Sequence, residues 1–225
     1  MQAKKQKPNV NLQKPRLEAH KSLAEGKPEK YWFMTPENKN EELFKMALYG
    51  WTREVKILLD EGANPNARDS EFGMTALMKA AVQGHFAICK LLIERGADVN
   101  ARSEKGDSKG STALMCAASN GYIDICKLLI EHGADVNARN KKGWTALMHA
   151  GRWGRTDICK LLVENGADAL AKDNANMTAH MIALEKGHDS AADFLKRMET
   201  IQQAVGRENL NAFLSNFRQC ISGGV

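Results

Sequence analysis

The sequence lacks the features that mark secreted, membrane-spanning and disulfide-stabilised proteins. No run of about 18 apolar residues occurs, so we expect no transmembrane helix. The lysine-rich first ten residues contain no apolar segment, which argues against a secretory signal peptide. The five cysteines form no Cys-x-x-Cys pair and have no zinc-like spacing with histidine. We therefore expect an intracellular protein in a reducing compartment, favouring the cytoplasm, with the nucleus as the alternative.

Signatures of catalysis and cofactor binding are also missing. The sequence has neither a Gly-x-Gly-x-x-Gly loop nor a Gly-Lys-(Ser/Thr) loop, so we expect no phosphate-binding turn. With 43% hydrophobic and 26% charged residues, the composition is that of an ordinary soluble chain. We expect a protein that is not an enzyme and that holds no cofactor and no metal.

The net charge of +5 resides in one segment of the chain. Residues 1–40 carry nine Lys or Arg against four Glu, and the remaining residues balance. The first 30 residues are polar and aperiodic, so we expect them to be disordered. Such a basic arm favours an acidic protein over nucleic acid, because no aromatic residues are interleaved with its lysines. The apolar cluster Tyr31–Met34 either folds back over the end of the folded domain or docks into another protein.

Two sequence blocks recur with one common period. Threonines of the first block are 37, 33 and 33 residues apart, which is the spacing of a repeat protein. The first block, Gly-x-Thr-Ala-Leu-Met and a degenerate last copy, lies at Gly73–Met78, Gly110–Met115, Gly143–Met148 and Asn176–Met181. The second block, Leu-Leu-x-x-x-Gly-Ala-(Asp/Asn), lies at Leu58–Asn64, Leu92–Asp98, Leu129–Asp135 and Leu162–Asp168.

Each repeat unit predicts two short helices. Thr75 can cap the first helix by accepting a backbone N–H, and Gly84 can end it in a left-handed conformation. A second helix is expected from about His85 to Glu94, with Gly96 after its end. Helices this short cannot bury their apolar faces alone, so neighbouring repeats must stack. The apolar face consists of Leu77, Ala80, Ala81, Ile88, Leu91 and Leu92.

These blocks resemble the ankyrin repeat, over roughly residues 38–198. The resemblance implies an all-α solenoid of stacked helix-turn-helix units with β-hairpin-like turns. Methionine and alanine replace the histidine and proline usual in that family, so we do not expect its Thr–His hydrogen bonds. The five repeats are about 38–70, 71–103, 104–140, 141–170 and 171–198. The first and last depart from the consensus, as terminal capping repeats do.

Several residues recur at equivalent positions and are interpreted as structural. Cys89, Cys126 and Cys159 occupy one helix position, where a thiol acts as a small buried hydrophobe. Asp98, Asp135 and Asp168 occupy one turn position. Outside the repeats, residues 1–37 form the basic arm and residues 199–225 form a tail with a short amphipathic helix. That helix either packs on the last repeat or engages a partner; its apolar residues are Leu210, Phe213, Leu214, Phe217 and Ile221.

The family resemblance implies that variable positions on the hairpins and first helices bind another protein. The fourth repeat is unusual there, because it has two tryptophans and several basic residues where the other repeats have Met, Ser, Gln or Asn. Trp and Arg are common interface anchors. His149 has no second ligand or orienting carboxylate, so we expect a solvated groove residue. The candidate binding residues are Phe72, Met74, Lys141, Lys142, Trp144, His149, Arg152, Trp153 and Arg155.

The function that these features favour is that of an adaptor or scaffold that binds a protein with an acidic and apolar epitope. We expect a monomer with no membrane partner. Packing is the alternative role for the tryptophans: Trp144 would cover a neighbouring turn, and Trp153 would cover Gly151. Two other functions stay open, a regulatory or inhibitory subunit acting through its ends, and a structural component of a ribonucleoprotein or cytoskeletal assembly.

Overall fold

The computed structural model describes residues 34–106 and 109–205, which form ten helices numbered α2 to α11. No strand occurs in these two ranges, which confirms the predicted all-α class. Within the same two ranges, no helix is both long and apolar enough to cross a membrane. The helices are α2 Pro36–Tyr49, α3 Thr52–Asp60, α4 Ala76–Gln83, α5 Phe86–Glu94, α6 Ala113–Asn120, α7 Ile123–Glu131, α8 Ala146–Arg152, α9 Thr156–Glu164, α10 Ala179–Glu185 and α11 Asp189–Val205.

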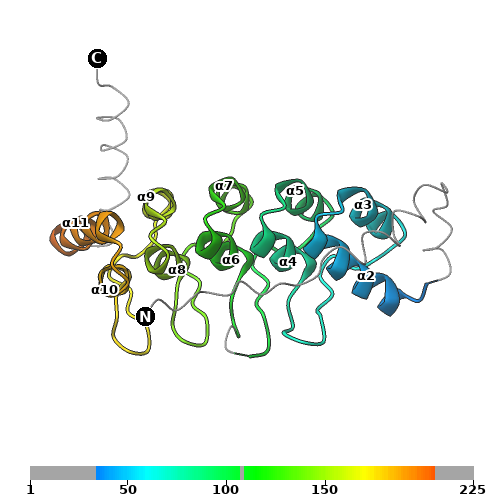
Figure 1. Ribbon diagram of the computed structural model, residues 1–225, viewed down its shortest axis with the longest axis horizontal. Coiled ribbons are helices and arrows are strands. Elements are labelled where there is room, and N and C mark those ends of the chain that lie inside the picture. The colour runs from blue at the N-terminus through cyan, green and yellow to red at the C-terminus, as the bar shows by residue number, and fades with distance from the viewer. Residues whose placement is uncertain (1–33, 107–108, 206–225) are drawn as a thin grey trace, which may run out of the picture.

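The helices are arranged in two parallel rows with a row of loops beside them (Figure 1). The inner row consists of α2, α4, α6, α8 and α10, each packed against the next. The outer row consists of α3, α5, α7, α9 and α11, each packed against its own inner helix. The loops project together along one edge of the inner row. This is the stacked helix-turn-helix architecture that the repeat pattern predicted.

The ends of the inner helices follow the predicted capping chemistry. The hydroxyls of Thr75, Thr112, Thr145 and Thr178 each accept the backbone N–H three residues later. Gly84 ends α4 with a φ of 82°, in the left-handed region. A Cβ atom at Gly84 would also lie 2.4 Å from the ring of Tyr122 in the next repeat. Glycine is therefore needed both for the turn and for the close approach of the next repeat.

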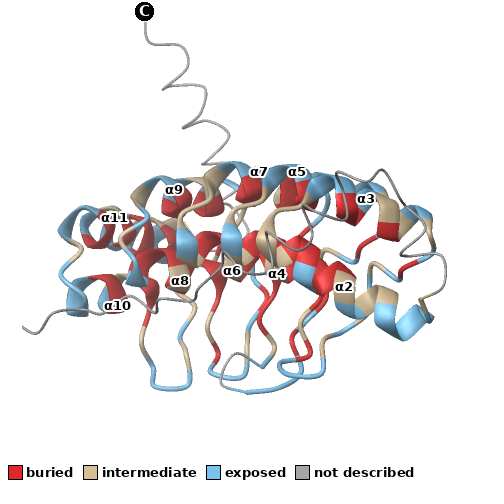
Figure 2. Ribbon diagram, turned by 45° about the vertical axis from the view of Figure 1, so that its right-hand side comes forward, coloured by how far each residue is buried: buried red, intermediate tan, exposed pale blue. Residues whose placement is uncertain are grey.

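The hydrophobic core lies between the two rows of helices, where buried residues gather (Figure 2). Leu77, Ala80 and Ala81 of α4 are fully or almost fully buried, as predicted. The thiols of Cys89, Cys126 and Cys159 have no exposed surface, and burial raises the pKa of each to about 12. They serve as small hydrophobic residues of the outer helices.

A ladder of asparagine side chains joins each repeat to the next. Asn66 donates to the carbonyl of Gly96 and accepts the N–H of Asp98. Asn100 makes the same pair of bonds to Gly133 and Asp135, and Asn137 makes them to Gly166 and Asp168. The side chains of Asp98, Asp135 and Asp168 in turn accept the N–H two residues later. These aspartates are structural turn residues, as expected.

The last helix extends beyond the expected end of the repeat domain. α11 passes through residue 198 and ends at Val205. Gln202, which is 2% exposed, donates to the carbonyl of Ala167 at 3.1 Å and accepts the N–H of Ala169 at 2.8 Å. This side chain closes the end of the asparagine ladder, so residues 199–205 belong to the packed body rather than to a separate tail.

Two expected features lie largely outside the described residues. Of the apolar cluster at residues 31–34, only Met34 is described, and it is half-buried against the core. The expected amphipathic helix, with Leu210 as its first apolar residue, lies outside entirely, as do the first 33 residues of the basic arm.

Candidate functional site

The loops that follow the outer helices form a row of linked hairpins. Each begins at a polar residue whose side chain accepts a backbone N–H across the turn, such as Asn140 from Trp144. Neighbouring hairpins are joined by backbone bonds, in which Lys141 donates to Lys109 and Asn174 donates to Lys142. The hairpins therefore form a wall along the inner helices, and we call the surface between this wall and the helices the groove. The residues that begin the hairpins are Asp69, Ser103, Asn140 and Asp173.

A hollow of about 240 Å³ lies in this groove, where the third and fourth repeats meet. The third repeat contributes Ser111 and Ser119, whose small side chains leave space in the groove. The fourth repeat contributes large side chains at and near the equivalent positions. The full lining consists of Ser111, Ser119, Asn140, Lys142, Trp144, His149, Arg152 and Trp153.

Trp144 forms one wall of the hollow and also connects two repeats. Its indole Nε1 donates to Oδ2 of Asp173 at 2.9 Å, and its side chain is half-buried. The ring of His149 meets it edge-on, with 5.1 Å between centroids. Trp144 therefore covers the turn of the fifth repeat while one part of its ring still faces the groove.

Arg152 lies between the two tryptophans at the end of α8. Its guanidinium carbon is 5.3 Å from the ring centroid of Trp144 and 6.0 Å from that of Trp153. Trp153 is 52% exposed, although tryptophan is ordinarily one of the more buried residue types. A Cβ atom at Gly151 would lie 2.9 Å from the carbonyl oxygen of Ala179 and 3.3 Å from the side chain of Leu195, so residues of the fifth repeat cover this glycine. Trp153 thus presents about half of its surface to solvent beside a cation.

His149 differs from the solvated side chain that we expected. Its Nε2 atom is buried and has no hydrogen-bond partner among the described residues. Burial lowers the pKa of His149 to about 4, and the positive charges of Arg152 and Lys142 act in the same direction. The imidazole is therefore neutral at physiological pH and serves as part of the wall against Trp144.

The charges around the hollow are mostly basic. Lys142 and Arg152 form no ion pair within the described ranges, and neither does Lys141 at the neighbouring hairpin tip. In contrast, Lys79, which occupies the position of His149 two repeats earlier, lies 2.7 Å from a carboxylate oxygen of Asp69. A second hollow of about 490 Å³ adjoins the first at the hairpin tips; it is lined by Lys141, Lys142, Trp144, Asp173, Asn174 and Ala175.

Three of the predicted binding residues lie away from both of these hollows. Phe72, which is 41% exposed, and the half-buried Met74 belong to the hairpin of the second repeat, in the same row as Trp144. Arg155 lies over Gly121, with its Nε atom 3.0 Å from where a Cβ of that glycine would be. Equivalent positions in other repeats hold His85 and Tyr122, which cover glycines in the same way. The structural role of Arg155 could have been predicted from the sequence, because Arg155, His85 and Tyr122 each directly follow a glycine of their own repeat.

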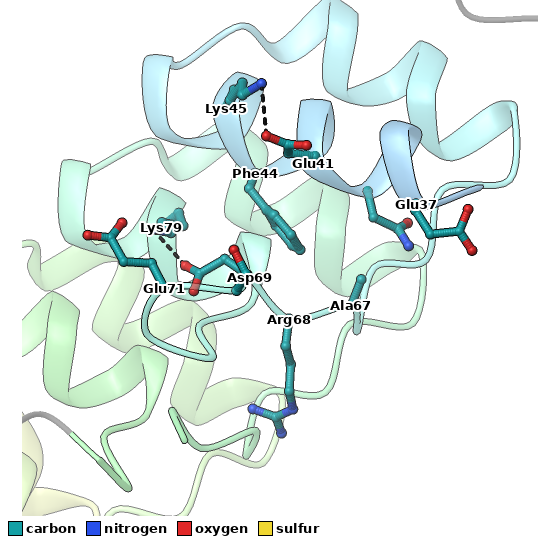
Figure 3. A pocket seen from close by; sticks show the side chains of 11 residues that line it. Glu37, Glu41, Phe44, Lys45, Ala67, Arg68, Asp69, Glu71 and Lys79 are labelled. Carbon is teal, nitrogen blue, oxygen red and sulfur yellow. Dashed lines mark ion pairs between the residues drawn. The ribbon is translucent and has the colours of Figure 1, made fainter. Parts of the chain in front are cut away.

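A third hollow, of about 440 Å³, lies at the junction of the first two repeats (Figure 3). Most of its charges are neutralised locally, since Lys45 pairs with Glu41 at 3.3 Å and Lys79 pairs with Asp69. Burial acts to raise the pKa of Asp69, but hydrogen bonds from Lys79 and two backbone N–H groups outweigh burial and lower it. The lining charges without an ion pair among the described residues are therefore acidic here, Glu37 and Glu71, and basic in the fourth repeat, Lys142 and Arg152.

The described ranges contain no group of three His, Cys, Asp or Glu side chains placed to hold a metal ion.

A sequence model of a family described as ankyrin repeats (3 copies) matches residues 16–103, 43–140, 101–173 and 137–206. Together these matches span most of the chain. No curated protein sequence matches it.

Proposed function

The chain belongs to the ankyrin-repeat family, whose repeats generally mediate protein–protein interactions, and on this premise we propose that it is a non-catalytic adaptor that binds a partner protein through the hollow of the third and fourth repeats. The observation that carries the proposal is the exposure of Trp153 beside Arg152 and Trp144. These are the residue types that dominate binding energy at protein interfaces.

The size of the hollow supports a protein partner over a small-molecule ligand. A volume of about 240 Å³ is below the roughly 300–1,000 Å³ of pockets that enclose small molecules or cofactors, and the adjoining hollow of about 490 Å³ lies open at the hairpin tips, where it would not enclose a ligand. The smaller hollow suits one or two side chains of a partner that extends along the groove. Because the asparagine ladder and the linked hairpins hold the wall in place, little conformational entropy would be lost on binding.

The test is a comparison of binding by matched variants. Peptides would be selected from a phage-displayed random library on the immobilised full chain, and their affinities measured for wild type, Trp153→Ala and Phe86→Ala. Phe86 is the control because it is an exposed aromatic residue on the outer helix α5. Loss of an interface anchor costs about 2 kcal/mol or more, so we expect Trp153→Ala to weaken binding by about 30-fold and Phe86→Ala to leave it unchanged.

Two results would contradict the proposal. One is equal affinity of wild type and Trp153→Ala for every selected peptide. The other is a loss of affinity in Phe86→Ala that is as large as the loss in Trp153→Ala. Circular dichroism of each variant confirms that the helices are retained, which is expected because both side chains are exposed.

One observation favours a second candidate, a regulatory subunit that acts through its C-terminal end. Met181 and Leu184 of α10 are 43% and 57% exposed, whereas their equivalents Met148 and Gly151 are buried beneath the next repeat. The last inner helix therefore has an open apolar face. If replacing Met181 and Leu184 with serine weakens the binding of selected peptides, and Trp153→Ala has no effect, this second candidate replaces the first.

A further inference from the structure

Arg152, Lys142 and Lys141 form a cluster of positive charge that the described part of the chain leaves without ion pairs. Some lysines of the solenoid lie beside carboxylates, such as Lys90 beside Glu94 and Lys127 beside Asp124, and others do not. What distinguishes the cluster in the fourth repeat is that its cations line two adjoining hollows.

Two acidic residues near the cluster are already engaged. Asp173 accepts the indole N–H of Trp144 with one oxygen and the backbone N–H groups of Ala175 and Met177 with the other. Oε1 of Glu185 lies 2.6 Å from Nζ of Lys186. This contact lowers the pKa of Glu185, and the charge of Arg152 lowers it by a smaller amount. The cations of the hollow therefore keep an excess of positive charge.

The position of Arg152 prepares it to bind a planar anion. Its guanidinium lies over the rings of Trp144 and Trp153, and its N–H groups point outward in the plane of the group. A carboxylate can accept two such N–H groups side by side. The neutral His149 adds no charge, so the anion would be held by Arg152 and Lys142.

We propose that the hollow recognises the carboxylate of an aspartate or glutamate in an extended segment of the partner, with an adjacent apolar side chain of that segment resting on Trp153. The inference rests on the proposed function and specifies the chemistry of the partner. One arginine beside two tryptophans, with one lysine in the same hollow, fits one carboxylate next to an apolar group. Nucleic acid would need a longer row of cations.

The test uses three short peptides and the full-length ¹⁵N-labelled protein. The peptides are acetyl-Gly-Leu-Asp-Leu-Gly-amide, the same peptide with Asn, and the same peptide with phosphoserine. The indole N–H signals of Trp144 and Trp153 report binding. We expect the Asp peptide to bind with a Kd of about 1 mM or below, and about tenfold more tightly than the Asn peptide. Affinity for the Asp peptide should fall as salt is raised.

Matched variants test whether Arg152 supplies the positive charge that binds the carboxylate. Arg152→Gln should weaken the Asp peptide about tenfold and leave the Asn peptide unchanged. Arg152→Lys should recover part of the affinity, because it keeps the charge but loses the planar fork. Arg53→Gln is the control, since Arg53 is an exposed arginine on the outer helix α3. Arg152 is exposed as well, so its replacement should not unfold the chain.

Three results would overturn the carboxylate assignment: equal binding of the Asp and Asn peptides, no effect of Arg152→Gln, or no indole shift at about 10 mM Asp peptide. Tighter binding of the phosphoserine peptide would also overturn it, in favour of a phosphopeptide partner. If Trp153→Ala still abolishes binding of library-selected peptides, the proposed function stands while this inference fails. If Trp153→Ala has no effect there either, both fail.

Discussion

The indole Nε1 of Trp144 donates a hydrogen bond to Oδ2 of Asp173 at 2.9 Å, and this bond joins the fourth repeat to the hairpin of the fifth. This hydrogen bond gives Trp144 a structural role that the other tryptophan of the fourth repeat does not have. Trp144 is a connecting residue that also forms one wall of the hollow. Trp153, which directly follows the last residue of α8, is exposed and is the one proposed as an anchor for a partner.

The bond between Trp144 and Asp173 should contribute measurably to stability. In a double-mutant cycle, Trp144→Phe and Asp173→Asn should each lower the free energy of unfolding, and their coupling energy should be about 1–2 kcal/mol. Asn is a suitable replacement for Asp173 because Asn140 occupies the equivalent position in the hairpin of the fourth repeat. Urea denaturation measures the cycle. Trp153→Phe is the control and should change the free energy by less than about 0.5 kcal/mol. A coupling energy near zero would show that the bond contributes nothing.

His149 should make stability depend on pH. Its pKa is about 4 in the folded chain against an ordinary value of 6.5, so the unfolded chain binds more protons between these values. The stabilising contribution is fully present above pH 6.5 and is lost as pH falls from 6.5 towards 4. It amounts to at most about 3 kcal/mol.

The measurement is urea denaturation of wild type and His149→Gln at several pH values from 7.5 to 4.5. We expect the stability of wild type to fall more steeply with decreasing pH than that of His149→Gln. All other titrating groups are common to both proteins, so the difference between the two curves isolates His149. Parallel curves would contradict the burial of this imidazole.

Gln202 should stabilise the C-terminal end of the solenoid. In Gln202→Ala, the N–H of Ala169 and the carbonyl of Ala167 lose their partner, at a cost of about 1–3 kcal/mol. Hydrogen exchange should become faster in α9 and α11 and stay unchanged in α4. Gln203→Ala is the matched control, because Gln203 is exposed on the same helix. Equal exchange in both variants would place the end of the packed body nearer to residue 198.

The sequence predicted the features that depend on local chemistry or on repetition. Thr75 and Gly84 cap and end α4 because a hydroxyl and a left-handed glycine act within a few residues of their own position. The burial of Cys89 followed from its recurrence in Cys126 and Cys159. Such positions have the same environment in each repeat, so one repeat predicts the next.

Features that depend on a single neighbour were not predictable in the same way. His149 is half-buried, and its Nε2 atom is enclosed because the side chain packs against Trp144; no other repeat carries both residues. Gln202 lies outside the period and closes the ladder only because α11 is longer than the other outer helices. The hollow itself arises where Ser111 and Ser119 of one repeat face the large side chains of the next.

The most direct test of the central claim is the indole region of the ¹⁵N spectrum while the tightest library-selected peptide is added. The chain has four tryptophans, and the half-buried Trp51 of the first repeat serves as an internal control. A partner that occupies the hollow should shift the indole N–H signal of Trp153, and to a lesser extent that of Trp144, and leave that of Trp51 in place. A shift of Trp51 with no change at Trp153 would contradict binding through the fourth repeat.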